Sequence, residues 1–171
     1  LFALLMQAAG RAGRDAAWMA EHGTPCAMWV QTYHPTHPVY EALRRHDYPA
    51  FAAQQLTERQ QASMPPFAFQ ALVRADARTQ PVAQAFLTAA AEAARSAALP
   101  GLEHVSLYPP VPLVVQRVAG VERAQMLIES TSRPALQHFL AAWQSVLRST
   151  RADPAHKGLV RWLVDVDPLA I

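Results

Sequence analysis

Two arginines near the start of the chain alternate with glycines three residues apart. Arg11 and Arg14 each follow a glycine, Gly10 and Gly13, and Gln7 stands three residues before the first glycine. Glycine lets the backbone turn sharply and approach a ligand closely. Arginine binds phosphate oxygens through a bidentate fork, so two guanidinium groups held by one turn can reach the same polyanion. The spacing predicts a phosphate-contacting turn, and the alternative is a surface turn whose arginines pair with carboxylates.

A second group of cations lies in the last third of the chain. Arg117 and Arg123 flank a predicted hairpin turn, and Arg133 opens a predicted helix. Between residues 109 and 161 the chain carries seven Lys or Arg residues against three Asp or Glu residues. This local excess of positive charge permits an anionic partner such as nucleic acid but does not require one.

Other polar residues argue against a metal site. His34 and His37 have a spacing that could ligate a metal, but no third ligand type clusters with them, so we interpret them as loop histidines. Asp165 and Asp167 share a face of a predicted strand but stand at its end, and we interpret them as strand-ending groups that pair with a helix. Cys26 is the single cysteine, which excludes an internal disulfide and a cysteine-built zinc site.

The composition fits a globular protein. The 171 residues suit one sizeable domain or a small domain with an appendage, and 51% of them are apolar. The net charge is +2, and no apolar run approaches the ~18 residues of a membrane span. Leu1 enters an apolar helical pattern without an initiator methionine. We therefore expect a segment of a larger, intracellular protein that has no membrane contact.

The first 66 residues predict helices and one short strand. Residues 1–9 form the end of a helix, and residues 39–46 and 48–63 form two more, the last stopping before Pro65-Pro66. The apolar segment Cys26–Tyr33 predicts a buried strand. An unpaired apolar strand is unfavourable, so we expect its partner strands to lie outside this chain.

From Phe67 onward the pattern predicts an α+β domain. The expected order is strand, helix, short strand, hairpin, amphipathic helix and strand. The ranges are 69–75, 81–98, 105–108, 113–118 with 123–129, a helix capped by Ser132, and 159–166. Two helices in a split β-α-β arrangement on one face of a sheet are typical of the ferredoxin-like folds.

The first motif resembles motif VI of the superfamily 2 helicases. In that motif, arginines contact the γ-phosphate of ATP bound between two motor lobes and stabilise charge in the transition state. The resemblance assigns Arg11 and Arg14 to catalysis, and Gln7, Gly10 and Gly13 to binding ATP with Mg²⁺ in the intact enzyme. The chain itself contains no G-x-x-x-x-G-K-[ST] loop to cradle phosphates, so we expect it to be inactive alone.

Taken together, the motifs resemble the bacterial replication-restart helicases of the primosomal protein N′ (PriA) family. After QAAGRAGR (7–14), the pieces follow in that family's order: VQTYHPTHP (30–38), DYPAF (47–51), ER (58–59), MPPF (64–67), LVRAD (72–76), PPVP (109–112), SR (132–133) and VDVDP (164–168). The resemblance implies a cytoplasmic bacterial protein that unwinds DNA 3′→5′ with ATP, recognises stalled forks and assembles the primosome.

The same resemblance implies a domain organisation. Residues 1–32 would be the tail of the second RecA-like motor lobe, residues 33–66 a helical linker, and residues 67–171 a C-terminal domain similar in fold to a ribosomal protein. The family's zinc sites would lie outside this chain.

The resemblance also implies partners for the later arginines. Arg117 and Arg123 lie where the family has a hairpin suited to branched and single-stranded DNA, but Glu122 stands where an aromatic residue is usual. The alternative is a solvated hairpin. Arg133 matches an arginine that helps hold the acidic C-terminal tail of single-stranded DNA-binding protein, and the alternative is a solvent-exposed arginine.

Two other functions remain open. The first is a protein–protein docking domain that packs on the motor and has little contact with DNA. The second is a fragment of another superfamily 2 helicase, such as a recombination-type remodeller, against which the PPVP, SR and DVDP pieces argue.

Overall fold

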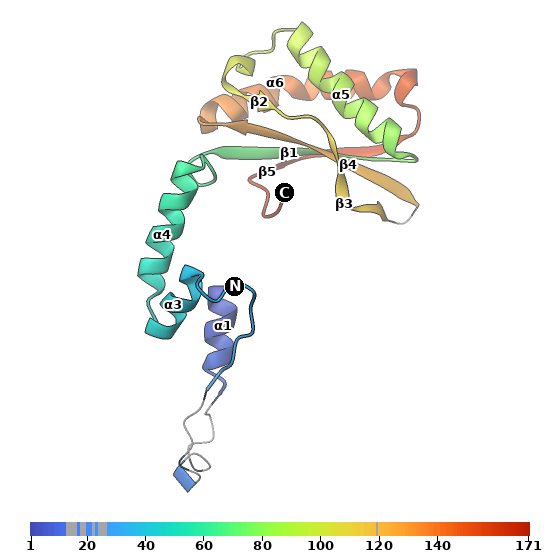
Figure 1. The fold of residues 1–171 in the computed structure, drawn as a ribbon. Coiled ribbons are helices and arrows are strands. Elements are labelled where there is room, and N and C mark those ends of the chain that lie inside the picture. Colours follow the sequence, from blue (N-terminus) through green and yellow to red (C-terminus); the bar gives the residue numbers. More distant parts are fainter. Residues whose placement is uncertain (13–16, 18–19, 22, 24–26, 119) are drawn as a thin grey trace. The chain divides into compact units, whose positions relative to one another are not determined.

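The computed structural model describes residues 1–12, 17, 20–21, 23, 27–118 and 120–171. The chain forms two compact units, Leu1–Glu58 and Arg59–Ile171 (Figure 1). Within the described ranges, no helix is long and apolar enough to cross a membrane.

The regular secondary structure described in the Leu1–Glu58 unit is helical. It contains α1 (Phe2–Ala9), α3 (Pro38–Arg45) and most of α4 (Tyr48–Gln61). Phe2 is buried and stacks on Phe51, with ring centroids 5.3 Å apart. The α4 helix begins after Asp47, whose Oδ1 accepts a hydrogen bond from the Ala50 N–H at 3.0 Å. All three predicted helices are present.

The predicted strand Cys26–Tyr33 is wrong for the residues that the structure describes. Residues 27–33 have no regular secondary structure, and Trp29 and Tyr33 are 93% and 99% exposed. Cys26 lies outside the described residues. A strand needs a neighbour to pair its backbone groups, and no strand occurs among the described residues of this unit.

The Arg59–Ile171 unit is built on an antiparallel sheet. The strands are β1 (Phe69–Ala77), β2 (Ser106–Leu107), β3 (Val111–Val118), β4 (Val121–Ser130) and β5 (Leu159–Val166). Their order is β2-β4-β1-β5, and β3 pairs with β4 in a hairpin. The central strand β1 is therefore flanked by β4 and β5 along almost its whole length.

Two helices, α5 (Gln80–Ser96) and α6 (Arg133–Ala152), cover one face of this sheet (Figure 1). The alanines and valine at alternate positions of β1, Ala71, Val73, Ala75 and Ala77, are fully buried on this side. The centre of the core is Trp143, which packs on Phe139 and donates a hydrogen bond from its indole N–H to the Ala90 carbonyl at 2.9 Å. An α+β arrangement with helices on one sheet face, as predicted, is confirmed.

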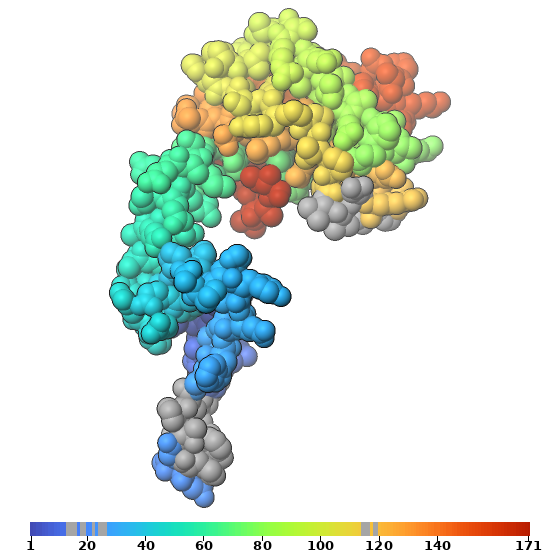
Figure 2. All heavy atoms as spheres, in the orientation of Figure 1, coloured from blue at the N-terminus to red at the C-terminus, as the bar shows by residue number. Residues whose placement is uncertain are grey.

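The opposite face of the sheet mixes apolar and charged side chains, and Leu72 and Leu163 are among the apolar ones. Asp76 on β1 stands in register with Arg123 on β4 and with Arg161 on β5. Arg74 on β1 lies 3.4 Å from Asp165 on β5. The last residues of the chain, red in Figure 2, lie against this face, where Arg74 Nη2 donates to the Ala170 carbonyl at 3.4 Å. The two helices thus leave this face uncovered, and the C-terminal residues contact part of it.

Candidate functional site

The predicted phosphate-contacting turn lies at the end of α1. Gln7 and Arg11 are exposed there, and Gly10 ends the helix with φ −69°, a conformation open to any residue. The Arg11 and Ala12 N–H groups donate to carbonyls three residues earlier, so a helical turn continues beyond Gly10. Gly13 and Arg14 lie outside the described residues. Arg11 is thus on an accessible surface, and its pairing with Arg14 stays a prediction.

The predicted hairpin of Arg117 is formed by β3 and β4. Gly120 adopts φ +80° at the turn, a left-handed conformation that favours glycine. Arg117 is exposed and stands opposite Glu122 in the strand register. Arg117 is therefore presented to solvent, and its contact with DNA stays a prediction.

Arg123 is held inside the domain rather than presented to a ligand. Its Nε lies 3.4 Å from Asp76 Oδ1, and its side chain is only 25% exposed. The other carboxylate oxygen of Asp76 accepts a hydrogen bond from Arg161 Nε at 2.7 Å. One nearly buried aspartate on β1 therefore joins arginines of both neighbouring strands.

Glu122 has a structural role that its sequence position did not indicate. Its Oε2 accepts a hydrogen bond from the Gln80 N–H, the first residue of α5, at 3.1 Å. A carboxylate at a helix N-terminus satisfies a free N–H group and interacts favourably with the helix dipole. Glu122 thus connects the hairpin to α5 and is not a free acid at the hairpin tip.

Arg133 lies at the other end of the domain, at the start of α6. As predicted, Ser132 caps this helix, and its hydroxyl accepts from the Ala135 N–H at 3.3 Å. The guanidinium of Arg133 lies 4.7 Å from the ring centre of Phe69 and donates to Asp167 Oδ2 at 2.7 Å. The interpretation as a helix-pairing group is confirmed for Asp167 and wrong for Asp165, which pairs with Arg74 on strand β1 at 3.4 Å. Arg133 therefore already has an acidic partner.

These arginines do not form one site. Arg123 contacts Asp76 and Arg133 contacts Phe69. These two residues of β1 are seven positions apart, which corresponds to about 23 Å of extended strand. Asp76 was missed by sequence reasoning. Aspartate is depleted in strands, and its place inside an apolar strand was the available signal.

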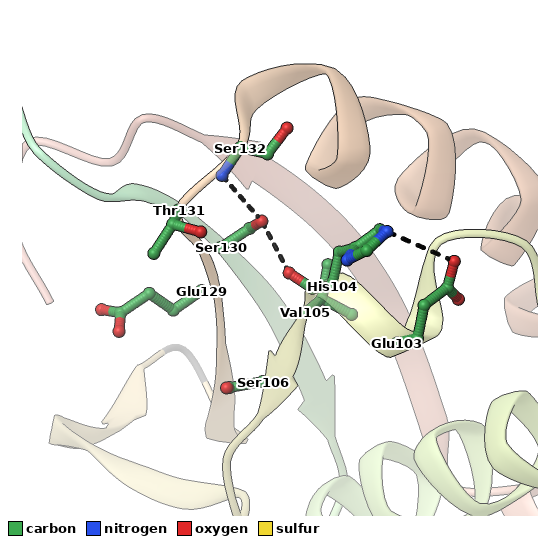
Figure 3. A pocket seen from close by; sticks show the side chains of 8 residues that line it. All are labelled: Glu103, His104, Val105, Ser106, Glu129, Ser130, Thr131 and Ser132. Atoms are coloured by element: carbon green, nitrogen blue, oxygen red, sulfur yellow. Dashed lines mark hydrogen bonds and ion pairs between the residues drawn. The ribbon is translucent and has the colours of Figure 1, made fainter.

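An open pocket lies beside the start of α6 (Figure 3). It has a volume of about 330 Å³ and is lined by Glu103, His104, Val105, Ser106, Glu129, Ser130, Thr131 and Ser132. Ser130 Oγ donates to the His104 carbonyl at 2.7 Å and accepts from the Ser132 N–H at 3.1 Å. These hydrogen bonds of the Ser130 hydroxyl connect the end of β4 to the short 3₁₀ helix Leu102–His104. Arg133 is not among the lining residues.

The histidines serve local structure. His37 Nδ1 accepts from the Val39 N–H at 3.2 Å and caps α3, and the His34 N–H donates to the Thr32 hydroxyl at 3.0 Å. Among the described residues, no three His, Cys, Asp or Glu side chains gather as metal ligands do.

Comparisons with known proteins place these features in a family. The family model for the primosomal protein N C-terminal domain matches residues 60–169. The chain is 35% identical to the replication restart protein PriA of Haemophilus influenzae over 96% of its own length and 20% of the relative's. It is 30% identical to the protein of that name from Synechocystis, over 99% of this chain and 18% of the relative.

The relative from Treponema pallidum, which has the same name, is 32% identical over 86% of this chain and 21% of its own length. The chain thus spans about a fifth of the length of these curated relatives. The family model alone matches more than half of the chain and includes every strand of the antiparallel sheet. This chain belongs to the primosomal protein N C-terminal domain family.

Proposed function

We propose that this chain works in the restart of DNA replication, as the C-terminal part of an ATP-dependent 3′→5′ DNA helicase that recognises stalled forks and assembles the primosome. The observation that carries this proposal is the family match over residues 60–169, together with relatives named as replication restart proteins. In the bacterial cytoplasm, the intact protein would bind ATP with Mg²⁺.

Within that protein, residues 1–32 would be the remnant of a RecA-like motor lobe. The exposed side chains of Gln7 and Arg11 are available to a nucleotide held by another lobe, and Arg14 would join them. The Arg59–Ile171 unit would be a ferredoxin-like domain, related in fold to a ribosomal protein. Its antiparallel order β2-β4-β1-β5 with two helices on one face supports this assignment.

A segment exchange tests the role in replication restart. The segment of the H. influenzae relative that aligns with this chain is replaced by this chain, and the hybrid is expressed in cells lacking their own restart protein. We expect the hybrid to restore growth after replication forks are damaged, whereas the relative with that segment deleted does not. A hybrid that hydrolyses ATP normally but fails to restore growth would contradict the proposal.

The proposed role of this domain is to bind branched and single-stranded DNA. Arg117 supports it, because its exposed guanidinium can contact phosphate without reading sequence. The second candidate is a docking domain with little DNA contact, and the ion pairs of Arg123 with Asp76 and of Arg133 with Asp167 favour it.

Arg133 is the proposed contact for the acidic C-terminal tail of single-stranded DNA-binding protein. Asp167 would compete with that tail, because it already accepts a hydrogen bond from the guanidinium at 2.7 Å. We therefore expect Arg133→Ala to abolish binding of a labelled tail peptide, and Asp167→Asn to strengthen it. Equal affinity of both variants and the unaltered chain in fluorescence anisotropy would show that Arg133 is not the contact.

A further inference from the structure

Five exposed cations gather at the end of the Arg59–Ile171 unit where β1 and α6 finish and β5 begins. We call this surface the cationic end, and its members are Arg78, Arg148, Arg151, Lys157 and Arg161. Figure 1 shows that the start of α5, the end of α6 and the start of β5 lie together at this end of the sheet. Residues far apart in the sequence therefore contribute to one surface.

Short contacts between the backbone segments hold this surface together. The Arg78 N–H donates to the Gly158 carbonyl at 2.9 Å, so the segment carrying Lys157 runs beside the end of β1. His156 Nδ1 lies 3.0 Å from the Thr150 carbonyl, which ties the same segment to the last turns of α6. The buried ring of His156 also packs edge-on against Phe86 of α5, with centroids 5.7 Å apart.

The cations of this surface are largely unpaired. In the part of the chain that the structure describes, Arg78, Arg148, Arg151 and Lys157 take part in no ion pair. Arg161 pairs with Asp76, yet its side chain remains 67% exposed. Arg148 and Arg151 are three residues apart on α6, so they project from neighbouring turns.

The carboxylates at this end are all occupied by structural contacts. Asp76 is 6% exposed and is shared by Arg123 and Arg161. Glu122 accepts from the first N–H of α5, and Asp153 Oδ1 accepts from the Ala155 N–H at 2.8 Å. Asp76 is thus buried and Glu122 is half-buried, whereas Asp153 is exposed. One exposed carboxylate therefore stands among the five exposed cations of this end.

Several other acidic residues lie toward the opposite end of the sheet. Glu129 pairs in register with Gln70 at the start of β1, and Glu103 lies beside the same strand end in the pocket of Figure 3. Asp167, which is 48% exposed, follows the last residue of β5. The unit thus has one positively charged end and one more negatively charged end.

We propose that the cationic end binds the phosphate backbone of nucleic acid without reading its sequence. A small anion would need convergent donors in a pocket, whereas these cations are spread over several elements and exposed. That distribution matches a polymer with repeated negative charges. This inference rests on the proposed DNA-binding role and relocates most of the contact from the hairpin, where Arg123 is held by Asp76, to the cationic end.

The test compares two double variants of the whole 171-residue chain that lose the same charge. Arg78→Gln with Lys157→Gln removes two cations of the cationic end. Arg59→Gln with Arg95→Gln removes two exposed cations elsewhere in the unit, where they donate to the Pro65 and Leu107 carbonyls. Affinity for a labelled DNA duplex of mixed sequence is measured by anisotropy between about 50 and 200 mM salt. Circular dichroism checks that both variants fold.

We expect the first pair to lower the salt slope by about two, because each lost phosphate contact removes about 0.9 from it. The loss of affinity between about 50 and 200 mM salt would then be roughly tenfold smaller than for the unaltered chain. The second pair should leave the slope unchanged. Equal changes in both pairs would overturn the inference, because they would reflect net charge alone.

A third variant separates this inference from the proposed function. If Arg117→Gln lowers the slope and the cationic-end pair does not, the inference fails while DNA binding through the hairpin stands. If the unaltered chain binds no DNA even at about 50 mM salt, both the inference and the DNA-binding role fail.

Discussion

At the scale of single residues, the charged side chains of this domain divide into those that hold the fold together and those that face solvent. The exposure of an arginine side chain could not be predicted from the sequence. Arg117 and Arg123 flank the same hairpin turn, yet only Arg117 is exposed. The difference comes from Asp76 on a neighbouring strand, and pairing across strands is not visible in a single sequence. The predicted cap at Ser132, in contrast, depends on residues within one turn and was found correctly.

Asp76 offers the first test. Asp76→Asn leaves the guanidinium groups of Arg123 and Arg161 without a carboxylate, and the Arg123 side chain is only 25% exposed. We expect the free energy of unfolding to fall by about 2 kcal/mol, measured by urea denaturation. Asp165→Asn is the control, because its partner Arg74 lies 3.4 Å away and Asp165 is 37% exposed. It should cost less than about 1 kcal/mol, and equal losses would contradict the role of Asp76.

Glu122 is expected to stabilise the start of α5. Glu122→Ala removes the acceptor of the Gln80 N–H, and loss of such a cap costs about 1 kcal/mol. Thermal unfolding should show a lower melting temperature, whereas Glu92→Ala, an exposed acid within the same helix, should leave it nearly unchanged. If the two substitutions have equal effects, the contact between Glu122 and α5 does not contribute to stability.

At the scale of elements, local sequence patterns predicted where helices and strands lie. Whether a predicted strand forms depended on a neighbouring strand with which its backbone can form hydrogen bonds. The segment 27–33 has the apolar composition of a strand and yet has no regular structure, because the described part of its unit contains no strand beside it. In the other unit, the strand predicted over residues 69–75 is present as β1 (Phe69–Ala77), and its alternate residues Ala71, Val73 and Ala75 are buried between the sheet and the helices.

Gly101 tests how closely the connection after α5 must approach α6. It has φ +83°, and a Cβ placed there would lie 3.1 Å from the Ala135 carbonyl oxygen and 3.3 Å from the Phe139 nitrogen. Gly101→Ala should therefore cost the left-handed strain of about 1 to 2 kcal/mol and at least about 1 kcal/mol more for displaced neighbours.

Gly120→Ala is the matched control for Gly101→Ala. Gly120 has φ +80°, but a Cβ there would meet nothing within 4 Å. It should show only the strain of about 1 to 2 kcal/mol in the same denaturation experiment. An equal or smaller loss for Gly101→Ala than for Gly120→Ala would show that α6 moves aside without cost.

At the scale of the whole molecule, the two units differ in the amount of apolar surface that they bury. Trp143, Phe86 and Phe139 are fully buried in the Arg59–Ile171 unit, whereas Phe2 and Val39 are the buried side chains described in the Leu1–Glu58 unit. The sequence predicted a break between a first part and a C-terminal domain at Phe67, and the compact unit begins at Arg59. Helix α4 (Tyr48–Gln61) spans the boundary between the two compact units, and the domain boundary at Phe67 stays a prediction.

Limited proteolysis should separate the two units. We expect a protease to cleave first within the Leu1–Glu58 unit, since few of its side chains are buried and segments with few buried contacts open most readily. The surviving fragment, identified by mass spectrometry, should contain the whole of Arg59–Ile171. Early cleavage inside α5 or α6 would contradict this order of stability.

The positions of the tryptophans have an optical consequence. Trp143 is fully buried with its indole N–H bonded to the Ala90 carbonyl, whereas Trp29 is 93% exposed. An indole in an apolar interior emits at shorter wavelength than one in water, so the fluorescence spectrum of this chain should contain a blue-shifted contribution from the Arg59–Ile171 unit. Replacing Trp29 by Phe would enrich that contribution, and its red shift would then report the loosening of the domain core without any added label.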